Sequence, residues 1–99
     1  LCGEMIAVER LHALGFVNFI EPTPDAVRAR ALGIAQRIRD NAPLSVLAAK
    51  ASIHATMSRG LEAGLVEAKR IYEPVYASED AQEGPRAFRE KREPQWAGR

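Results

Sequence analysis

Residues 78–99 read S-E-D-A-Q-E-G-P-R-A-F-R-E-K-R-E-P-Q-W-A-G-R, and they contain signals for both ends of one helix. Ser78 is a favourable N-cap because its hydroxyl can accept a hydrogen bond from a free backbone N–H, and the acidic residues after it suit the positive end of the helix dipole. Lys91 and Arg92 suit the negative end, and Pro94 excludes a helical conformation from the residue before it. We therefore expect a helix that ends near Arg92.

Two features inside this stretch leave alternatives open. Gly84-Pro85 allows one continuous helix, or a short first turn followed by a main helix from Pro85. Phe88 lies three and four residues before Lys91 and Arg92, so one helical face carries an aromatic ring beside two cations. Such a face can hold a nucleotide, with the base on the ring and a phosphate on the ammonium. In the other interpretation Phe88 anchors a core and the cations only balance the helix dipole.

Length and composition narrow the class of protein. A chain of 99 residues fits one small domain with a thin core, and much of its 46% hydrophobic content is alanine. A net charge of +1 argues against a nucleic-acid-binding surface. The single cysteine, Cys2, fits a reducing cytoplasm, and no apolar run approaches the length of a membrane span. Because the chain opens on Leu1 without an initiator methionine, we interpret it as part of a longer chain.

The first 22 residues predict a short helix and an extended exit. Three apolar residues recur at helical spacing before Gly15, which is expected to end a helix of about two turns. The segment Phe16–Ile20 is apolar and β-prone, and Glu21-Pro22 closes it.

Three further helices are predicted before residue 78. Thr23 is expected to cap the first of them, and Asn41-Ala42-Pro43 to separate it from the second. The second has a stripe of small residues suited to close packing, formed by Leu44, Leu47, Ala48, Ala51 and Ala55. After a turn at Ser58–Gly60, the third has an apolar face formed by Leu61, Leu65, Ala68, Tyr72 and Val75, and Pro74 is expected to bend or end its last turn. The predicted fold class is all-α, with about five helices and the one short extended segment near Phe16–Ile20.

Neither a catalytic constellation nor a metal site is evident in the sequence. His54 lies near the small-residue stripe, where a histidine is most often hydrogen-bonded and partly buried, and no second ligand or triad partner stands at a suitable spacing. The glutamates fall on exposed helical positions with no implied partner, as in Glu62, Glu67 and Glu73. We predict no catalytic residue and no metal ligand in this chain.

Both ends of the chain resemble the enoyl-CoA hydratase/isomerase (crotonase) family. Its C-terminal signature of E-G, A-F, E-K-R, a proline and an aromatic is matched by Glu83-Gly84, Ala87-Phe88, Glu90-Lys91-Arg92, Pro94 and Trp96. Its earlier L-T-G and G-L-V-N segments and the V-P-like exit after them are matched at Leu1, Gly3, Gly15, Val17, Asn18 and Pro22. The departures are Cys2 for threonine, Leu11 for alanine, and Ala7 where a capping Asp or Ser is usual, which weakens the cap of the first helix.

The resemblance implies how the chain divides and what it binds. Residues 1–22 would be the end of the crotonase core, and residues 23–99 a helical oligomerisation and CoA-lid region that forms a homo-oligomer, a trimer or dimer of trimers. Phe88 and Lys91 would reach the adenosine phosphate end of coenzyme A, often bound mainly by a neighbouring subunit. The substrate would be an acyl-CoA thioester of fatty-acid or related metabolism, with no tightly bound cofactor.

The resemblance also implies where the chemistry lies. The family's oxyanion hole and its paired glutamates belong to the part of the chain upstream of L-T-G, so residues 1–99 alone are expected to be inactive, and the reaction type is left open. The alternative hypothesis is an independent, non-catalytic helical module that binds a partner helix through its alanine-rich stripes.

Overall fold

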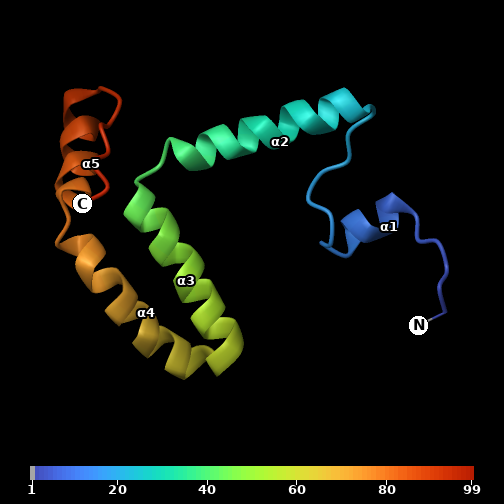
Figure 1. Ribbon diagram of the computed structural model, residues 1–99, viewed down its shortest axis with the longest axis horizontal. Coiled ribbons are helices and arrows are strands. Elements are labelled where there is room, and N and C mark those ends of the chain that lie inside the picture. Colours follow the sequence, from blue (N-terminus) through green and yellow to red (C-terminus); the bar gives the residue numbers. More distant parts are fainter. Residues whose placement is uncertain (1) are drawn as a thin grey trace. The chain divides into compact units, whose positions relative to one another are not determined.

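Five helices make up the regular structure of residues 2–99, the part of the chain that the computed structural model describes. They are α1 (Val8–Ala13), α2 (Pro24–Arg39), α3 (Pro43–Arg59), α4 (Leu61–Tyr76) and α5 (Glu79–Glu90), shown in Figure 1. No strand occurs among the described residues. The predicted all-α class with about five helices is confirmed.

The chain forms two compact units that meet within α2. One unit runs to Gln36 and the other starts at Arg37. This boundary reflects packing, whereas the predicted division into residues 1–22 and 23–99 concerns function, so that division stays a prediction.

In the first unit, α1 is short and lacks a side-chain N-cap. Ala7 is its N-cap and makes no side-chain cap, as its lack of a polar side chain predicts. The prediction of an extended segment at Phe16–Ile20 is wrong for its first three residues, because residues 16–18 form a bend, and the segment pairs with no strand among the described residues. The Phe16 N–H donates to the Leu11 carbonyl at 2.9 Å, the guanidinium of Arg30 lies 4.9 Å from the centre of the Phe19 ring, and Arg30 also pairs with Glu21 at 2.6 Å.

The start of α2 follows its sequence signals. The Thr23 hydroxyl accepts a hydrogen bond from the Ala26 N–H at 3.2 Å, which confirms the predicted cap. Pro24 is the first helical residue. At its other end α2 stops at Arg39, and the Asn41 side chain donates to the Arg37 carbonyl at 2.7 Å.

In the second unit, α3 and α4 form an antiparallel pair joined at Gly60, whose φ of 81° lets the chain reverse. The helices approach most closely at Gly64, where an added Cβ would lie 2.7 Å from Thr56 Oγ1. Ala48 and Val75 are buried, 5% and 8% exposed. The two helices therefore meet through small residues, as expected.

Other members of the predicted stripes do not reach this core. Leu47 is 65% exposed and Leu65 is 54% exposed, although both belong to the predicted stripes. A pair of helices covers only the side of each that faces the other, and the stripes are wider than that contact. Pro74 does not stop α4 at once, because the helix continues to Tyr76.

Helix α5 begins at the predicted cap and is continuous. The Ser78 hydroxyl accepts from the Ala81 N–H at 3.2 Å and donates to the Val75 carbonyl at 2.6 Å. The helix passes through Pro85 without a break, so the split arrangement is wrong. It ends at Glu90, slightly before the expected position near Arg92.

The C-terminal tail, residues 93–99, folds back along α5, and the C-terminus lies beside the start of that helix (Figure 1). There the Glu79 N–H donates to the Arg99 carbonyl at 2.7 Å. The Trp96 indole N–H donates to the Asp40 carbonyl at 2.8 Å, and its ring covers Gly84. The tail thus ties α5 to the junction of α2 and α3.

Candidate functional site

The last turn of α5 presents an aromatic ring to solvent. Phe88 is 85% exposed, so the interpretation of Phe88 as a core anchor within this chain is wrong. The buried residue of that turn is its neighbour Ala87, which is 1% exposed. Helical geometry explains the difference, since adjacent residues point about 100° apart and only one can face the tail.

Lys91 follows this turn in an uncommon backbone conformation. Its φ of 53° and ψ of 41° are left-handed, and it is the one non-glycine residue with positive φ among residues 2–99. The Lys91 N–H donates to the Phe88 carbonyl at 3.3 Å, and the Arg92 N–H donates to the Ala87 carbonyl at 3.1 Å. This pair of bonds is a Schellman motif, in which the left-handed position is usually glycine.

The Lys91 side chain lies at the surface. Within the described part of the chain it forms no ion pair. The exposed ring of Phe88 and this free cation therefore belong to the same helix end. The structure brings together the two residues that the sequence singled out.

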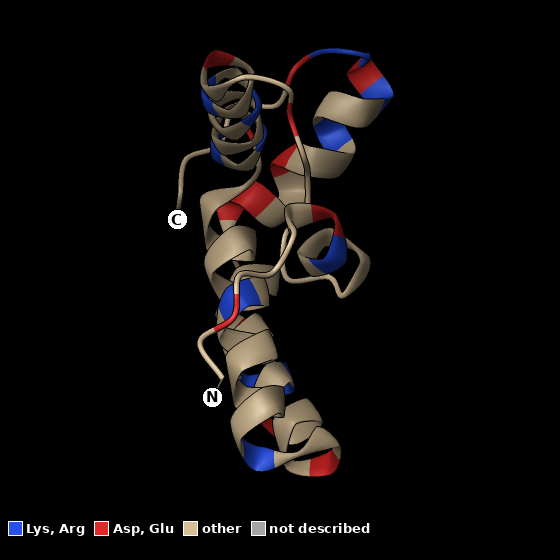
Figure 2. Ribbon diagram, turned by 90° about the vertical axis from the view of Figure 1, so that its right-hand side faces the viewer, with Lys and Arg blue, Asp and Glu red and all other residues tan. Residues whose placement is uncertain are grey.

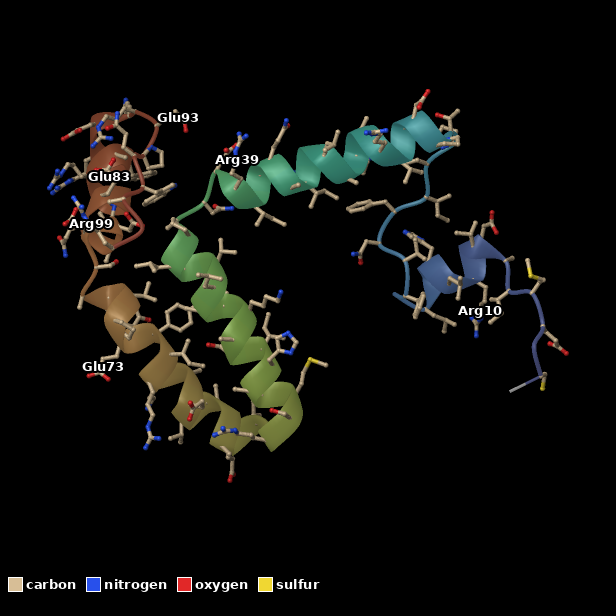
Figure 3. The ribbon with its side chains drawn as sticks, in the orientation of Figure 1. Arg10, Arg39, Glu73, Glu83, Glu93 and Arg99 are labelled. Atoms are coloured by element: carbon tan, nitrogen blue, oxygen red, sulfur yellow. The ribbon has the colours of Figure 1, made fainter. Side chains whose placement is uncertain are left out.

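Beside them, Glu83, Arg92 and the backbone of Gln95 form what we term the clamp. The Arg92 guanidinium binds both oxygens of the Glu83 carboxylate, at 2.6 and 3.0 Å, and its Nε also donates to Glu90 at 2.6 Å. The Gln95 N–H donates to the same Glu83 carboxylate at 2.8 Å. Figure 3 labels Glu83 on α5, and Figure 2 shows cations and carboxylates side by side where the chain turns back.

Within the clamp, Glu83 and Arg92 form a pair of opposite charges at neutral pH. The hydrogen bonds from Arg92 and then from Gln95 lower the pKa of Glu83 to about 2. The hydrogen bond to Glu83 in turn raises the pKa of Arg92. Because the two bonds are parallel, they fix the orientation of the guanidinium as well as its position.

Asp80 holds the tail further along. Its carboxylate is buried, 4% exposed, and accepts from the Ala97 N–H at 2.7 Å and the Gly98 N–H at 3.1 Å. Sequence reasoning treated the acidic residues of this turn as partners of the helix dipole and missed their contacts with the tail. An acidic residue followed by a glycine-containing C-terminal segment is too common a pattern to have indicated them.

The remaining candidates form no second site. His54 is exposed, contrary to the expected partly buried position. Glu67 has partners that were not expected, with Arg59 at 3.3 Å and Arg70 at 4.0 Å. Within residues 2–99 no group of three or more His, Cys, Asp or Glu side chains could hold a metal ion. None of the described helices is long and apolar enough to cross a membrane.

Comparison with known proteins identifies the relatives of this chain. Residues 1–99 match the protein family described as enoyl-CoA hydratase/isomerase. Curated relatives include the 2,3-dehydroadipyl-CoA hydratase of Escherichia coli K12, 32% identical over all of this chain and 38% of the relative, and the carnitinyl-CoA dehydratase of Citrobacter koseri, 36% identical over all of this chain and 39% of the relative.

Solved structures that match this chain include an enoyl-CoA hydratase and an enoyl-CoA hydratase/isomerase. The enoyl-CoA hydratase of Mycobacterium tuberculosis H37Rv matches 98% of this chain with a TM-score of 0.88 and 37% identity, over 38% of its own length. An enoyl-CoA hydratase/isomerase of Mycobacterium paratuberculosis matches 99% of this chain with a TM-score of 0.89 and 35% identity, over 38% of its own length. The chain thus corresponds to the C-terminal part of these proteins, about two fifths of their length. It belongs to the enoyl-CoA hydratase/isomerase family.

Proposed function

We propose that this chain is the coenzyme A-binding and oligomerisation segment of an enzyme that acts on acyl-CoA thioesters. One observation supports it above the others: Phe88 is 85% exposed beside a Lys91 that forms no ion pair among residues 2–99. An exposed ring beside an unpaired cation is an arrangement that can hold a nucleotide, with the base on the ring and a phosphate on the ammonium. The printed names of the relatives, hydratases and a dehydratase of CoA thioesters, supply the class of partner.

In this proposal the adenine of coenzyme A packs against Phe88 and a phosphate pairs with Lys91. Aromatic rings stack on nucleotide bases, and an ammonium group forms a charge-assisted hydrogen bond with phosphate. Neither residue touches the thioester, so both contribute to binding rather than to bond making. No resident cofactor is needed, because coenzyme A enters and leaves as part of the substrate and product.

Lys91→Ala in the full-length enzyme tests the proposal. An exposed charge-assisted contact is worth about 1 kcal/mol, so KM for a CoA ester should rise about fivefold while kcat is unchanged. The rise should shrink as salt is added, because salt screens exposed charges. Lys50→Ala removes an exposed cation from α3 and is the matched control. An unchanged KM at low salt, in a correctly assembled Lys91→Ala enzyme, would contradict the proposal.

We also propose that the whole enzyme is a homo-oligomer, a trimer or a dimer of trimers. The support is the apolar surface that α3 and α4 leave uncovered. Its exposed members include Ile53 at 60%, Met57 at 80%, Leu61 at 66% and Leu65 at 54%. Such a patch is costly in water and is expected to lie against another part of the enzyme or another subunit. Sedimentation of the full-length enzyme measures this, and a stable monomer would count against it.

The catalytic groups are proposed to come from the rest of the enzyme. We place the reaction in fatty-acid or related acyl-CoA metabolism and the enzyme in the cytoplasm, where Cys2 would stay reduced. Residues 1–99 alone should not hydrate crotonyl-CoA above background. Activity of this segment that one Glu→Gln change abolishes would show that a catalytic carboxylate had been missed.

A further inference from the structure

We infer that Glu83 and Arg92 are positioning residues for the Lys91 ammonium: the clamp holds the left-handed turn from which Lys91 reaches its ligand. This inference rests on the proposed function, in which that ligand is a phosphate of coenzyme A. Neither positioning residue is expected to touch the substrate. They act through the backbone on either side of Lys91.

The backbone of Lys91 needs support because lysine does not favour its conformation. A left-handed turn places Cβ close to the following carbonyl oxygen, a clash that glycine avoids. Local sequence preference would put glycine here, or would let lysine relax into the right-handed region. A side chain that persists in a disfavoured conformation indicates that its surroundings impose the conformation and that the side chain has a use there.

The clamp supplies that support from both sides of the turn. Glu83 lies on the rigid part of α5, before the turn, whereas Arg92 and Gln95 follow it. Arg92 donates to the Glu83 carboxylate at 2.6 and 3.0 Å, and the Gln95 N–H donates to it at 2.8 Å. Rotation of the backbone at Lys91 would move Arg92 and Gln95 together away from Glu83 and would break all three bonds.

The same geometry assigns different tasks to the two adjacent cations. The Arg92 guanidinium forms ion pairs with Glu83 and with Glu90, and the shortest distance in each pair is 2.6 Å. The two carboxylates neutralise its charge. A phosphate approaching Arg92 would meet two negative charges. Lys91 has no such partner among the described residues and is the cation free to bind.

Glu83→Gln in the full-length enzyme tests the inference. Glutamine keeps the size of the side chain but loses the charge and one acceptor oxygen, so the bidentate pair is lost. We expect KM for the CoA ester to rise severalfold, no more than in Lys91→Ala, with kcat unchanged. Arg92→Lys should have the same effect, because lysine keeps the charge but cannot form the planar two-bond contact. This second variant keeps the test available if Glu83→Gln assembles poorly.

Two readouts separate positioning from general loosening. A substrate with pantetheine in place of coenzyme A lacks the nucleotide, so its KM should be the same in wild type, Glu83→Gln and Arg92→Lys. In the Lys91→Ala background, Glu83→Gln should add nothing, since there is no ammonium left to position. Glu67→Gln breaks the exposed pair with Arg59 on the α3–α4 pair and should leave both KM values unchanged.

The outcomes distinguish the inference from the proposed function. If Lys91→Ala raises KM but Glu83→Gln and Arg92→Lys do not, the clamp does not position Lys91 and the inference fails alone. A rise that also affects the pantetheine substrate, or that adds fully to Lys91→Ala, would likewise overturn it. If Lys91→Ala itself has no effect, the proposed function fails, and the inference fails with it.

Discussion

The left-handed backbone of Lys91 allows binding and stability to be separated by changing one residue in two ways. Lys91→Ala and Lys91→Gly both remove the ammonium, and both lose the same interaction with the helix dipole. Only glycine also removes the steric conflict at φ 53° and ψ 41°. The difference between the two variants therefore isolates the cost of the backbone conformation.

That difference can be estimated from two opposing terms. Removing Cβ from a left-handed position relieves about 1–2 kcal/mol. Glycine also makes the unfolded chain more flexible, which costs about 0.4–1 kcal/mol relative to alanine. The mid-range values differ by about 0.8 kcal/mol, and the limits by about 0 and about 1.6 kcal/mol, so Lys91→Gly should be more stable than Lys91→Ala. Both variants should bind CoA esters about fivefold more weakly than wild type, following the estimate of about 1 kcal/mol for an exposed charged contact.

Chemical denaturation of the two full-length variants, at one protomer concentration, measures the free energy of unfolding. Steady-state kinetics at low salt measures KM. A Lys91→Gly variant that is less stable than Lys91→Ala would refute the strained left-handed turn. A glycine variant that keeps wild-type KM would refute a role for the ammonium. We expect Lys91→Gly to be more stable than Lys91→Ala and to bind CoA esters more weakly than wild type. This combination is typical of a residue that is kept for its ligand at some cost to the stability of the fold.

Two further predictions concern the fold and the clamp. Gly64→Ala should destabilise the full-length enzyme by about 1–3 kcal/mol, measured by unfolding in denaturant, because the new methyl group would collide with Thr56. In the control Gly33→Ala, the added Cβ meets nothing within 4 Å, so this change in α2 should be neutral or stabilise by up to about 1 kcal/mol. Equal effects of the two changes would contradict the close crossing of α3 and α4. Because the pKa of Glu83 falls from its ordinary 4.5 to about 2, its contribution to stability is complete above about pH 4.5 and is lost as the pH falls toward 2. Glu83→Gln should accordingly flatten the pH dependence of unfolding between these values, and an unchanged acid profile would contradict the ionised pair.

The helix boundaries were predictable because the signals that set them are local. A hydroxyl at Thr23 or Ser78 can satisfy a free N–H three residues later whatever the rest of the chain does, and both caps form. Pro43 likewise begins α3, since a proline at the first helical position removes no hydrogen bond. The family was predictable for the same reason, because its signature is a spacing pattern within one short stretch.

The burial of individual side chains was not predictable from periodicity. Leu47 fits an apolar stripe and Phe88 could be interpreted as a core anchor, yet they are 65% and 85% exposed. Periodicity shows which residues share a face, but it does not show whether the chain itself covers that face. The Trp96 contact with Asp40 joins residues 56 positions apart, and no local pattern indicates such a pairing.

The clamp also spans the part of α5 that local sequence preference makes weakest. Pro85 lacks an N–H and weakens the helix at its centre, but Glu83 precedes it and Arg92 follows the helix end, so their ion pair bridges the weak point. In the inference above, the same pair holds the chain that turns back after Glu90 and so keeps Lys91 in the left-handed turn. Sequences tend to violate local preferences where a function requires it, and a lysine in a position that favours glycine is such a violation. The carboxylate of Glu83 therefore links the stability of α5 to the placement of the proposed coenzyme A ligand.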